Sequence, residues 1–368
     1  MAMSSLLTLL TTVLFLLPAT SSVAQEMQKI TDLAGRQLKV PATIERVICS
    51  GPGCLRLLSY LQLTQMVVGV DEMEVREDSF DPRPYALAYP ALSTLPVFGG
   101  LRGQDQPELI LGLTPLPQII FKAAASMGHD PIALQHKTGI PVIVLDDGDL
   151  DSHREQLYRS LRLMAQITGR QERGESVIEY IDHILKDLNT RTASIVPDQQ
   201  HRAFVGGIAF KGSRGLLSTD PNYLPFALVN AQNIAASPSN RRLSQADMDR
   251  EHLLIRNPDF LFFDLASSQQ NQKNGFQQLR NNHLYHTLDA VETGQVYGLL
   301  PHNWYGKNYG SILSNAYFVG KTLYPEQFKD IDPRSKADEI FNFLLGTPLF
   351  NQLNQQGRDL ALTTIPLD

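Results

Sequence analysis

The sequence predicts an α/β protein of two Rossmann-like lobes with central parallel sheets, joined by one long α-helix and enclosing a ligand cleft. Three observations lead to this prediction. Short apolar strands alternate with helical segments in the first half, helical periodicity runs from about residue 152 to 195, and a second alternating set follows. Strands separated by helices pair in parallel, because each helix returns the chain to the same end of the sheet.

The first 24 residues have the pattern of an export signal. An apolar run from Leu6 to Pro18 precedes Ser22-Val23-Ala24, which fits a small-x-small cleavage site. The run is too short to hold the mature chain in a bilayer, so we expect cleavage near Ala24 and a soluble periplasmic protein. Because no Lys or Arg precedes Leu6, an uncleaved interfacial anchor is the alternative.

The first half begins with a hairpin and continues with single strands. Polar and apolar residues alternate over residues 30–41 around a turn at Ala34-Gly35. A strand at residues 47–50 is broken by Gly51-Pro52-Gly53, after which leucines recur at helical spacing. Further strands are expected at residues 66–70, 119–122 and 142–145.

Two apolar stripes on either side of Gly169 predict a long helical link, and strands are expected beyond it at residues 203–210, 260–264 and 296–300. About 340 residues remain after the signal, which is enough for two domains. The expected division is a signal peptide at 1–24, a first lobe at 25–168, a linking helix at 169–196 and a second lobe at 197–368.

Composition narrows the classes of function. A formal net charge of −6 argues against a nucleic-acid partner, and 43% hydrophobic with 19% charged residues is typical of a globular chain. Cys49 and Cys54 are interpreted as buried small apolar residues, with a local disulfide as the alternative.

Motifs of common enzymes and metal sites are absent from the sequence. It holds no Gly-x-Ser-x-Gly, Cys-x-x-Cys, His-Glu-x-x-His or P-loop pattern. His129, His136 and His153 do not share a helix face at ligand spacing. The acidic run at residues 146–151 lacks the closing glutamate of a calcium loop. We therefore expect no catalytic site, no bound metal and no cofactor.

Several segments together resemble one family of transport proteins. Asp32, Gly35-Arg36, Pro41 and Arg46-Val47, then residues 107–119 and 253–262, are similar to segments of the substrate-binding proteins of ABC importers for ferric siderophores, haem and cobalamin. A subgroup described as iron transport binding proteins is resembled by Gly206-Gly207, Phe210-Lys211-Gly212, Ser218-Thr219, Asn222-Tyr223, Pro225-Phe226, Asn303-Trp304-Tyr305, Asn308, Asn315-Ala316-Tyr317 and residues 320–325.

The resemblance implies a monomer that captures a solute and delivers it to the membrane permease. A ferric siderophore is the first expectation, followed by molybdate or tungstate, and then cobalamin or haem. A chelatase-like or reductase-like enzyme on the same fold and a sensor subunit are the alternatives from other classes, because a fold does not fix a function.

Ligand-binding candidates follow from the rule that ligands lie beyond the carboxyl ends of parallel strands. Backbone N–H groups at residues 50–53 and cations from both lobes could hold an anion, and the segment around the single tryptophan offers aromatic and amide groups. These candidates are Ser50, Gly51, Gly53, Lys122, Lys211, Ser213, Arg214, Asn303, Trp304, Tyr305 and Asn308.

The resemblance also implies acidic residues on each lobe that meet arginines of the permease. Glu251 corresponds to the acid of the second lobe. Asp130 is the nearest acid to the expected position in the first lobe, offset by about one residue. An ordinary surface carboxylate is the alternative for both.

Overall fold

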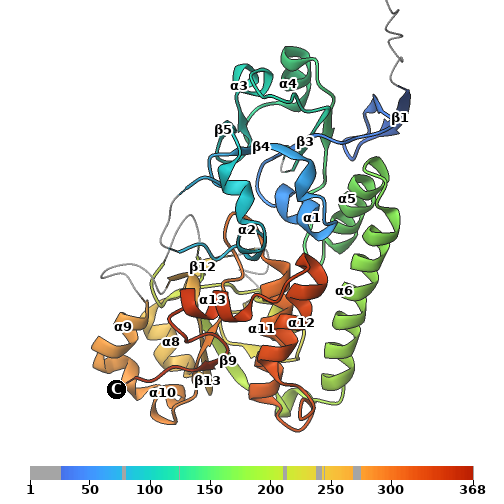
Figure 1. The fold of residues 1–368 in the computed structure, drawn as a ribbon. Helices are drawn as coiled ribbons and strands as arrows, with labels where there is room; N and C mark the ends of the chain where they lie inside the picture. Colours follow the sequence, from blue (N-terminus) through green and yellow to red (C-terminus); the bar gives the residue numbers. More distant parts are fainter. Residues whose placement is uncertain are drawn as a thin grey trace, which may run out of the picture.

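The computed structural model describes residues 26–76, 80–123, 125–209, 214–237, 243, 245–267 and 275–367. They form two lobes, one above the other in Figure 1, with helix α6 (Gln171–Thr192) along one side. The expected signal peptide at residues 1–24 lies outside the described residues. Within the described ranges, no helix is long and apolar enough to cross a membrane.

The first lobe is built on a six-stranded sheet in the order β6-β5-β4-β3-β7-β8, parallel except for β6. Successive residues of its central strand enter different clusters, since Val47 and Cys49 face the main core while Ile48 faces a second one. The elements are β1 (Met27–Thr31), β2 (Gln37–Pro41), β3 (Val47–Ser50), α1 (Cys54–Tyr60), β4 (Val67–Asp71), α2 (Pro84–Ala88), β5 (Val97–Gly100), β6 (Gln104–Asp105), α3 (Pro107–Leu111), β7 (Ile119–Lys122), α4 (Pro131–Thr138) and β8 (Val142–Val144).

The second lobe carries a five-stranded sheet in the order β11-β9-β13-β14-β15, parallel except for β15. Its elements are β9 (Arg202–Gly206), β10 (Ser218–Thr219), α7 (Leu224–Ala227), β11 (Gln232–Asn233), β12 (Ala246–Asp247), α8 (Arg250–Arg256), β13 (Phe260–Asp264), α9 (Gly275–Asn281), α10 (Asp289–Glu292), β14 (Val296–Leu299), α11 (Tyr309–Leu323), α12 (Pro333–Leu345), α13 (Phe350–Gln356) and β15 (Thr363–Thr364).

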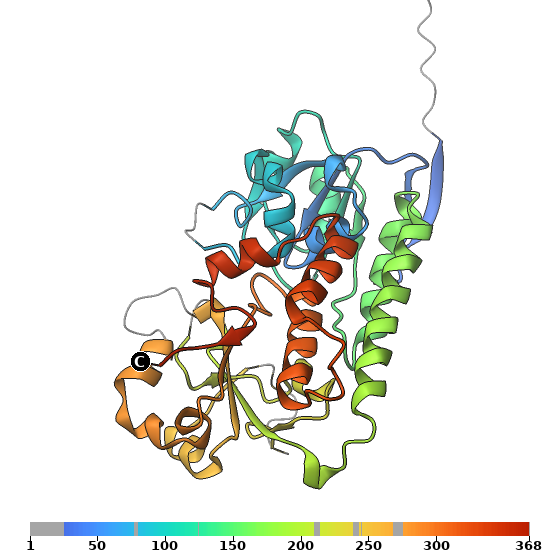
Figure 2. The ribbon, with the colours of Figure 1, turned by 60° about the horizontal axis from the view of Figure 1, so that its bottom comes forward.

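Two consecutive helices join the lobes. Helix α5 (Arg154–Ile167) ends before Gly169, whose φ of +70° lets the chain turn into the 22-residue helix α6. The apolar stripe of α6 is buried at Val177, Ile181, Ile184 and Leu188, and the helix runs beside both lobes in Figure 2. The two stripes seen in the sequence are therefore two helices with a glycine turn between them.

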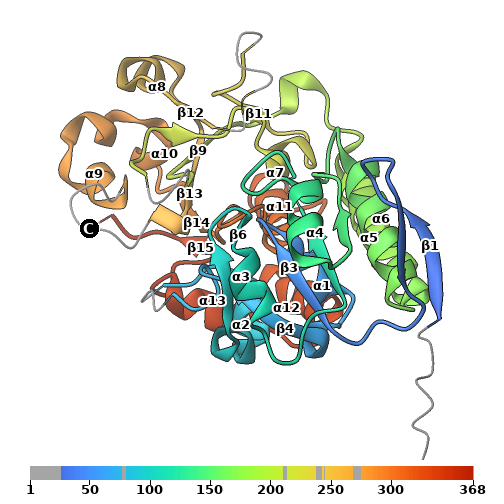
Figure 3. The same cartoon turned by 90° about the horizontal axis from the view of Figure 1, so that it is seen from above.

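The main apolar core extends across both lobes. Helix α12 of the second lobe packs against α1 and α2 of the first, and one hydrophobic cluster includes buried residues of both lobes. Arg173 on α6 donates to the carbonyl oxygens of Tyr60 and Phe343, which belong to different lobes, at 2.9 and 2.5 Å. The opening hairpin β1–β2 lies at the edge of the first lobe near α5 (Figure 3) and contributes Ile30 and Val40 to this core.

The fold class expected from the sequence is confirmed, with several local corrections. Strand β5 was not predicted, and β9 ends at Gly206 rather than continuing to residue 210. Cys49 and Cys54 are joined by a disulfide, so the interpretation as unpaired buried residues is wrong. Gly51 and Gly53 have positive φ, which reverses the chain between the two cysteines and lets them meet. The three-part division of the mature chain remains our proposal, which the two separate sheets support.

Candidate functional site

The carboxyl ends of the central strands lead into the region where the two lobes meet. Strand β3 ends at Ser50 and β7 at Lys122 in the first lobe, and β14 leads into residues 300–308 in the second. We call Asn303–Asn308 the crossing segment, because its residues contact loops of the first lobe. The region agrees with the position expected for a ligand in open parallel sheets.

The glycine loop after β3 allows two strand ends to approach closely. A Cβ atom on Gly51 would lie 2.5 Å from the carbonyl oxygen of Ala123, and Gly51 has a φ of +87°. Gly53, at φ +83°, precedes α1 and contacts the crossing segment, since a Cβ atom on Gly306 would lie 3.3 Å from its nitrogen. Gly51 therefore serves packing, whereas Gly53 lies at the junction of the lobes.

Lys122 is fully buried and has three partners. Its Nζ atom lies 2.5 Å from the Asp105 carboxylate, 3.1 Å from the hydroxyl of Ser50 and 3.2 Å from the carbonyl oxygen of Gly103. The charge of Lys122 is thus balanced inside the first lobe. Ser50, equally buried, is part of the same network and holds the loop after β3 to β7.

The crossing segment forms a tight turn against the first lobe. Asn303 pairs with Lys307 in an antiparallel bridge, and the Trp304 N–H donates to the carbonyl oxygen of Gly306 at 3.0 Å. The indole packs edge-on against Phe80, with ring centroids 5.9 Å apart. The only tryptophan of the chain therefore reports on the contact between the lobes.

Tyr305 makes the most direct polar link between the lobes. Its hydroxyl donates to the carboxylate of Asp71 and accepts from the backbone N–H of Arg102 at 2.9 Å. Burial raises the pKa of Asp71 to about 7, against lowering by the hydrogen bond from Tyr305. Burial and the nearby Asp71 raise the pKa of Tyr305. The tyrosine is therefore a neutral hydrogen-bond donor.

Asn308, the last residue of the crossing segment, also forms hydrogen bonds with both lobes. It is fully buried, and its Nδ2 donates to the carbonyl oxygens of Pro82 and Pro301 at 3.1 Å each, so it too spans both lobes. Its Oδ1 is buried without a hydrogen-bond partner among the described residues. Asn303 donates from Nδ2 to the carbonyl oxygen of Ala209, in its own lobe, at 3.3 Å.

A buried acid–histidine cluster, not predicted from the sequence, lies at the carboxyl ends of β13 and β14. The Nδ1 atom of His302 lies 2.9 Å from the carboxylate of Asp264, and its Nε2 lies 3.8 Å from that of Asp220. Burial raises the pKa of Asp220, whereas His302 lowers it. Among the described residues, no group of three or more His, Cys, Asp or Glu could hold a metal ion.

Two arginines near the crossing segment were not predicted from the sequence as site residues. Arg56 on α1 is 2% exposed, and its Nη2 donates to the carbonyl oxygen of Trp304 at 3.3 Å. Arg102 has an exposed side chain in the loop that binds Tyr305. Arg56 stands among leucines at helical spacing, and one polar residue on an apolar face was the signal that could have indicated it.

The remaining ligand candidates are at the edge of the described structure. Lys211 and Ser213 lie outside the described residues. Arg214 is half-buried, and its backbone N–H donates to the Ser267 hydroxyl at 2.8 Å. Their expected role as a clamp from the second lobe stays a prediction.

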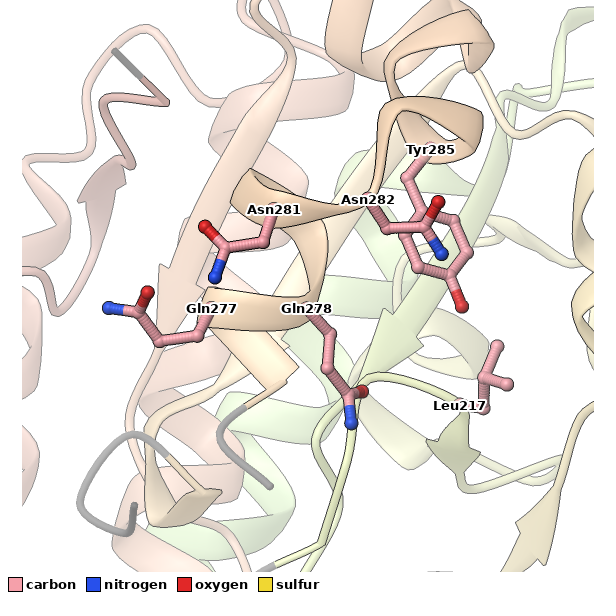
Figure 4. Close-up of a pocket in the computed structure, with 6 residues that line it drawn as sticks. All are labelled: Leu217, Gln277, Gln278, Asn281, Asn282 and Tyr285. Atoms are coloured by element: carbon pink, nitrogen blue, oxygen red, sulfur yellow. The ribbon is translucent and has the colours of Figure 1, made fainter. Parts of the chain in front are cut away.

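A cavity of about 780 Å³ lies in the second lobe. Figure 4 shows its amide-rich lining. The lining residues are Leu217, Gln277, Gln278, Asn281, Asn282 and Tyr285. Gln278 already accepts a hydrogen bond from the Leu216 N–H at 3.0 Å, and Asn282 accepts one from the Leu284 N–H at 3.1 Å. Two of its four side-chain amides are thus engaged in local structure.

Both acids expected to dock on a permease are exposed. Glu251 lies in the first turn of α8. Asp130 caps α4, where its side chain accepts from the Ala133 N–H at 2.8 Å. Asp130 therefore has a local structural role, whatever it contacts in addition.

Two α/β lobes joined by a long helix, with strand ends facing a shared junction, define a two-lobed binding protein. Residues 47–302 match the periplasmic binding protein family, so the chain belongs to that family. The family expected from the sequence is confirmed.

Three known proteins illustrate the likeness. The molybdate-binding protein MolA of Haemophilus influenzae is 21% identical over 332 residues, which cover 85% of this chain and 89% of MolA. The structure of MolA bound to molybdate has a TM-score of 0.66 at 18% identity, covering 87% of this chain and 98% of that one. The structure of a periplasmic solute binding protein from Veillonella parvula has a TM-score of 0.70 at 17% identity. The match covers 90% of this chain and 96% of that one. The structure of the periplasmic haem binding protein HutB of Vibrio cholerae has a TM-score of 0.54 at 20% identity. The match covers 76% of this chain and 99% of that one.

Proposed function

We propose that this chain is the periplasmic solute-binding component of an ABC importer and that its solute is a compact oxyanion of the molybdate or tungstate class. The observation that carries the choice of solute is the crossing segment. Tyr305 and Asn308 hydrogen-bond the first lobe directly, so the lobes touch at the strand ends. A small tetrahedral anion needs less space beside such contacts than a bulky chelate does, which favours the small anion.

The proposed site combines groups from both lobes. Backbone N–H groups near Gly53, the cations Arg56 and Arg102, and the polar groups of the crossing segment suit the oxygens of an anion. Trp304 and Tyr305 close the site on the side of the second lobe. The likeness to MolA supports the same class of solute.

A ferric siderophore is the second candidate. It is favoured by the segments that resemble iron transport binding proteins, among them residues 303–305 and 320–325. In that case Trp304 and Tyr305 would line a wider opening and contact the chelate with their ring faces.

The test is a titration of the purified mature chain, after extensive dialysis, followed by Trp304 fluorescence and by calorimetry. Molybdate, tungstate, sulfate, a ferric siderophore, haem and cobalamin form the panel. We expect saturable binding of molybdate and tungstate and weak binding of sulfate. Binding of the ferric siderophore alone would replace the first candidate with the second. A Trp304→Phe variant identifies Trp304 as the source of the fluorescence change, and calorimetry of the wild-type chain measures the affinity independently of that signal.

A further inference from the structure

A buried cation that forms no ion pair with the described residues lies at the junction of the lobes. Arg56 is on α1, directly after the glycine loop, and only 2% of its surface is exposed. Its guanidinium lies 5.3 Å from the centre of the Tyr85 ring. Burial raises the pKa of Glu74 and the nearby charges of Arg83 and Arg56 lower it, but the Glu74 carboxylate forms its ion pair with Arg83.

The acids of this region are engaged with other cations. Glu74 and Asp81 form ion pairs with Arg83 at 2.8 and 2.6 Å. Asp105 is paired with Lys122. Within the part of the chain that the structure describes, no carboxylate lies within ion-pair distance of Arg56, and its buried Nε has no acceptor.

An unpaired buried cation is costly for folding. Removing a charge from water costs several kcal/mol unless a counter-charge and hydrogen bonds replace the lost hydration. The single hydrogen bond to the Trp304 carbonyl is long, at 3.3 Å, and uses one of five N–H donors. A residue chosen for stability alone would be apolar at this position.

Two glycines, one from each lobe, lie beside the guanidinium. A Cβ atom on Gly53 would lie 3.6 Å from Nη1 and one on Gly306 would lie 2.9 Å from it, so neither residue places a side chain against Nη1. A shift of Gly306 away from Arg56 would therefore uncover Nη1.

We propose that Arg56 is the principal positive charge that recognises the solute. The inference rests on the proposed function and deepens it. An oxygen-rich anion enters between Gly53 and Gly306 and accepts hydrogen bonds from Nη1 and Nη2, which replaces the long bond from Nη2 to Trp304. A free oxyanion and a carboxylate oxygen of a metal chelate share this chemistry.

The alternative role for Arg56 is structural: its hydrogen bond to Trp304 would hold the two lobes together. Arg173 provides the matched control, because it also joins the lobes through carbonyl oxygens and has no carboxylate partner among the described residues. If Arg56 has only this structural role, its substitution should change the unfolding temperature and the shift by solute in the same way as substitution of Arg173.

The experiment compares the full mature chain with Arg56→Met, Arg56→Lys and Arg173→Met. Thermal unfolding is measured without solute and with saturating molybdate or ferric citrate, and affinities are measured by calorimetry. We expect Arg56→Met to keep or raise the unfolding temperature without solute, to bind at least tenfold more weakly and to lose the stabilisation by solute. Arg56→Lys is expected to bind the solute with an affinity between those of the wild type and Arg56→Met, because an ammonium group lacks the planar fork of the guanidinium. Arg173→Met is expected to lower the unfolding temperature and keep the shift by solute.

The outcomes separate the two proposals. If the wild-type chain binds molybdate and Arg56→Met binds it equally well, the role of Arg56 is overturned while the proposed function stands. If the wild-type chain binds only ferric citrate and Arg56→Met binds it equally well, both the role of Arg56 and the proposed solute class are overturned. A fall in unfolding temperature for Arg56→Met like that of Arg173→Met, with an unchanged shift by solute, also overturns it. Failure of the wild-type chain to bind either anion overturns the proposed solute class together with the role of Arg56.

Discussion

The hydroxyl of Tyr305 in the second lobe donates a hydrogen bond to the carboxylate of Asp71, the last residue of strand β4 in the first lobe. Asp71 is 3% exposed, and burial raises its pKa to about 7. The contact between the lobes therefore includes a group that titrates near neutral pH.

Asp71→Asn is expected to flatten the dependence of stability on pH. The unfolded carboxyl releases its proton near pH 3.8, whereas the folded one holds it up to about pH 7. The folded state therefore binds more protons between these values, so the free energy of unfolding of the wild-type chain falls as pH rises through this window. Asparagine does not titrate, so the free energy of unfolding of the variant relative to the wild type should rise across the window by up to about 4 kcal/mol.

The measurement is urea unfolding of both proteins across this pH range. Asp220, whose pKa is also raised, contributes equally to both curves and cancels in their difference. Parallel curves would show that Asp71 is ionised throughout.

Lys122→Met is expected to destabilise the first lobe by about 3 kcal/mol, because it leaves the Asp105 carboxylate buried without its partner. The double variant Lys122→Met with Asp105→Leu should recover most of the loss, since no charge then remains unpaired. Chemical denaturation of the single and double variants measures this coupling. Additive losses in the double variant would contradict the prediction.

Gly51→Ala is expected to be more damaging than Gly35→Ala. Both glycines have positive φ, so each substitution costs about 1 kcal/mol in backbone strain. A Cβ atom on Gly35 meets nothing within 4 Å, whereas one on Gly51 meets the carbonyl oxygen of Ala123 at 2.5 Å. We expect the loss in unfolding free energy for Gly51→Ala to be at least twice that for Gly35→Ala. Equal losses would mean that the strands separate easily at this point.

Replacement of Cys49 and Cys54 by serine is expected to lower the unfolding free energy by about 2 kcal/mol, the chain-entropy value for so short a loop. The pair encloses the glycine loop, so solute affinity should fall as well because the loop must be ordered on binding. Wild-type protein treated with a reductant should behave in the same way. Unchanged affinity in both would show that the turn is fixed by its backbone alone.

Glu251→Ala is expected to reduce the solute-dependent stimulation of the importer's ATPase in a reconstituted system and to leave solute affinity unchanged. Asp130→Asn separates the two roles of that residue, because asparagine keeps the helix cap but removes the charge. Stimulation reduced by Asp130→Asn supports docking, and stimulation equal to wild type assigns Asp130 to capping. Glu172→Ala, an exposed acid on α6, is the control.

The sequence predicted the architecture because apolar periodicity and glycine turns are local signals. The strands β3, β7 and β13 were located at their observed bounds, since each is a continuous apolar run between turn residues. Strand β5 was missed because Val97–Gly100 contains two glycines and only two apolar residues.

The site was predicted less well, because it depends on contacts across long separations in the chain. Arg56 and Trp304 are 248 residues apart, and no local pattern indicates that they meet. Lys122 was placed correctly at the end of its strand, but its pairing with Asp105 is a property of the folded lobe. The order of the segments was thus readable from the sequence, whereas the partners of each charge were not.

The continuous core across the lobes has a kinetic consequence. Helix α12 packs on the first lobe, and Arg173 holds both lobes to α6, so swinging the lobes apart would break packing that a solute cannot replace. The crossing segment, by contrast, is short and held by a few hydrogen bonds. We expect solute exchange to follow the nanosecond-to-microsecond excursions of a loop rather than the slower rotation of whole domains, and stopped-flow association to depend little on solvent viscosity beyond the diffusional encounter.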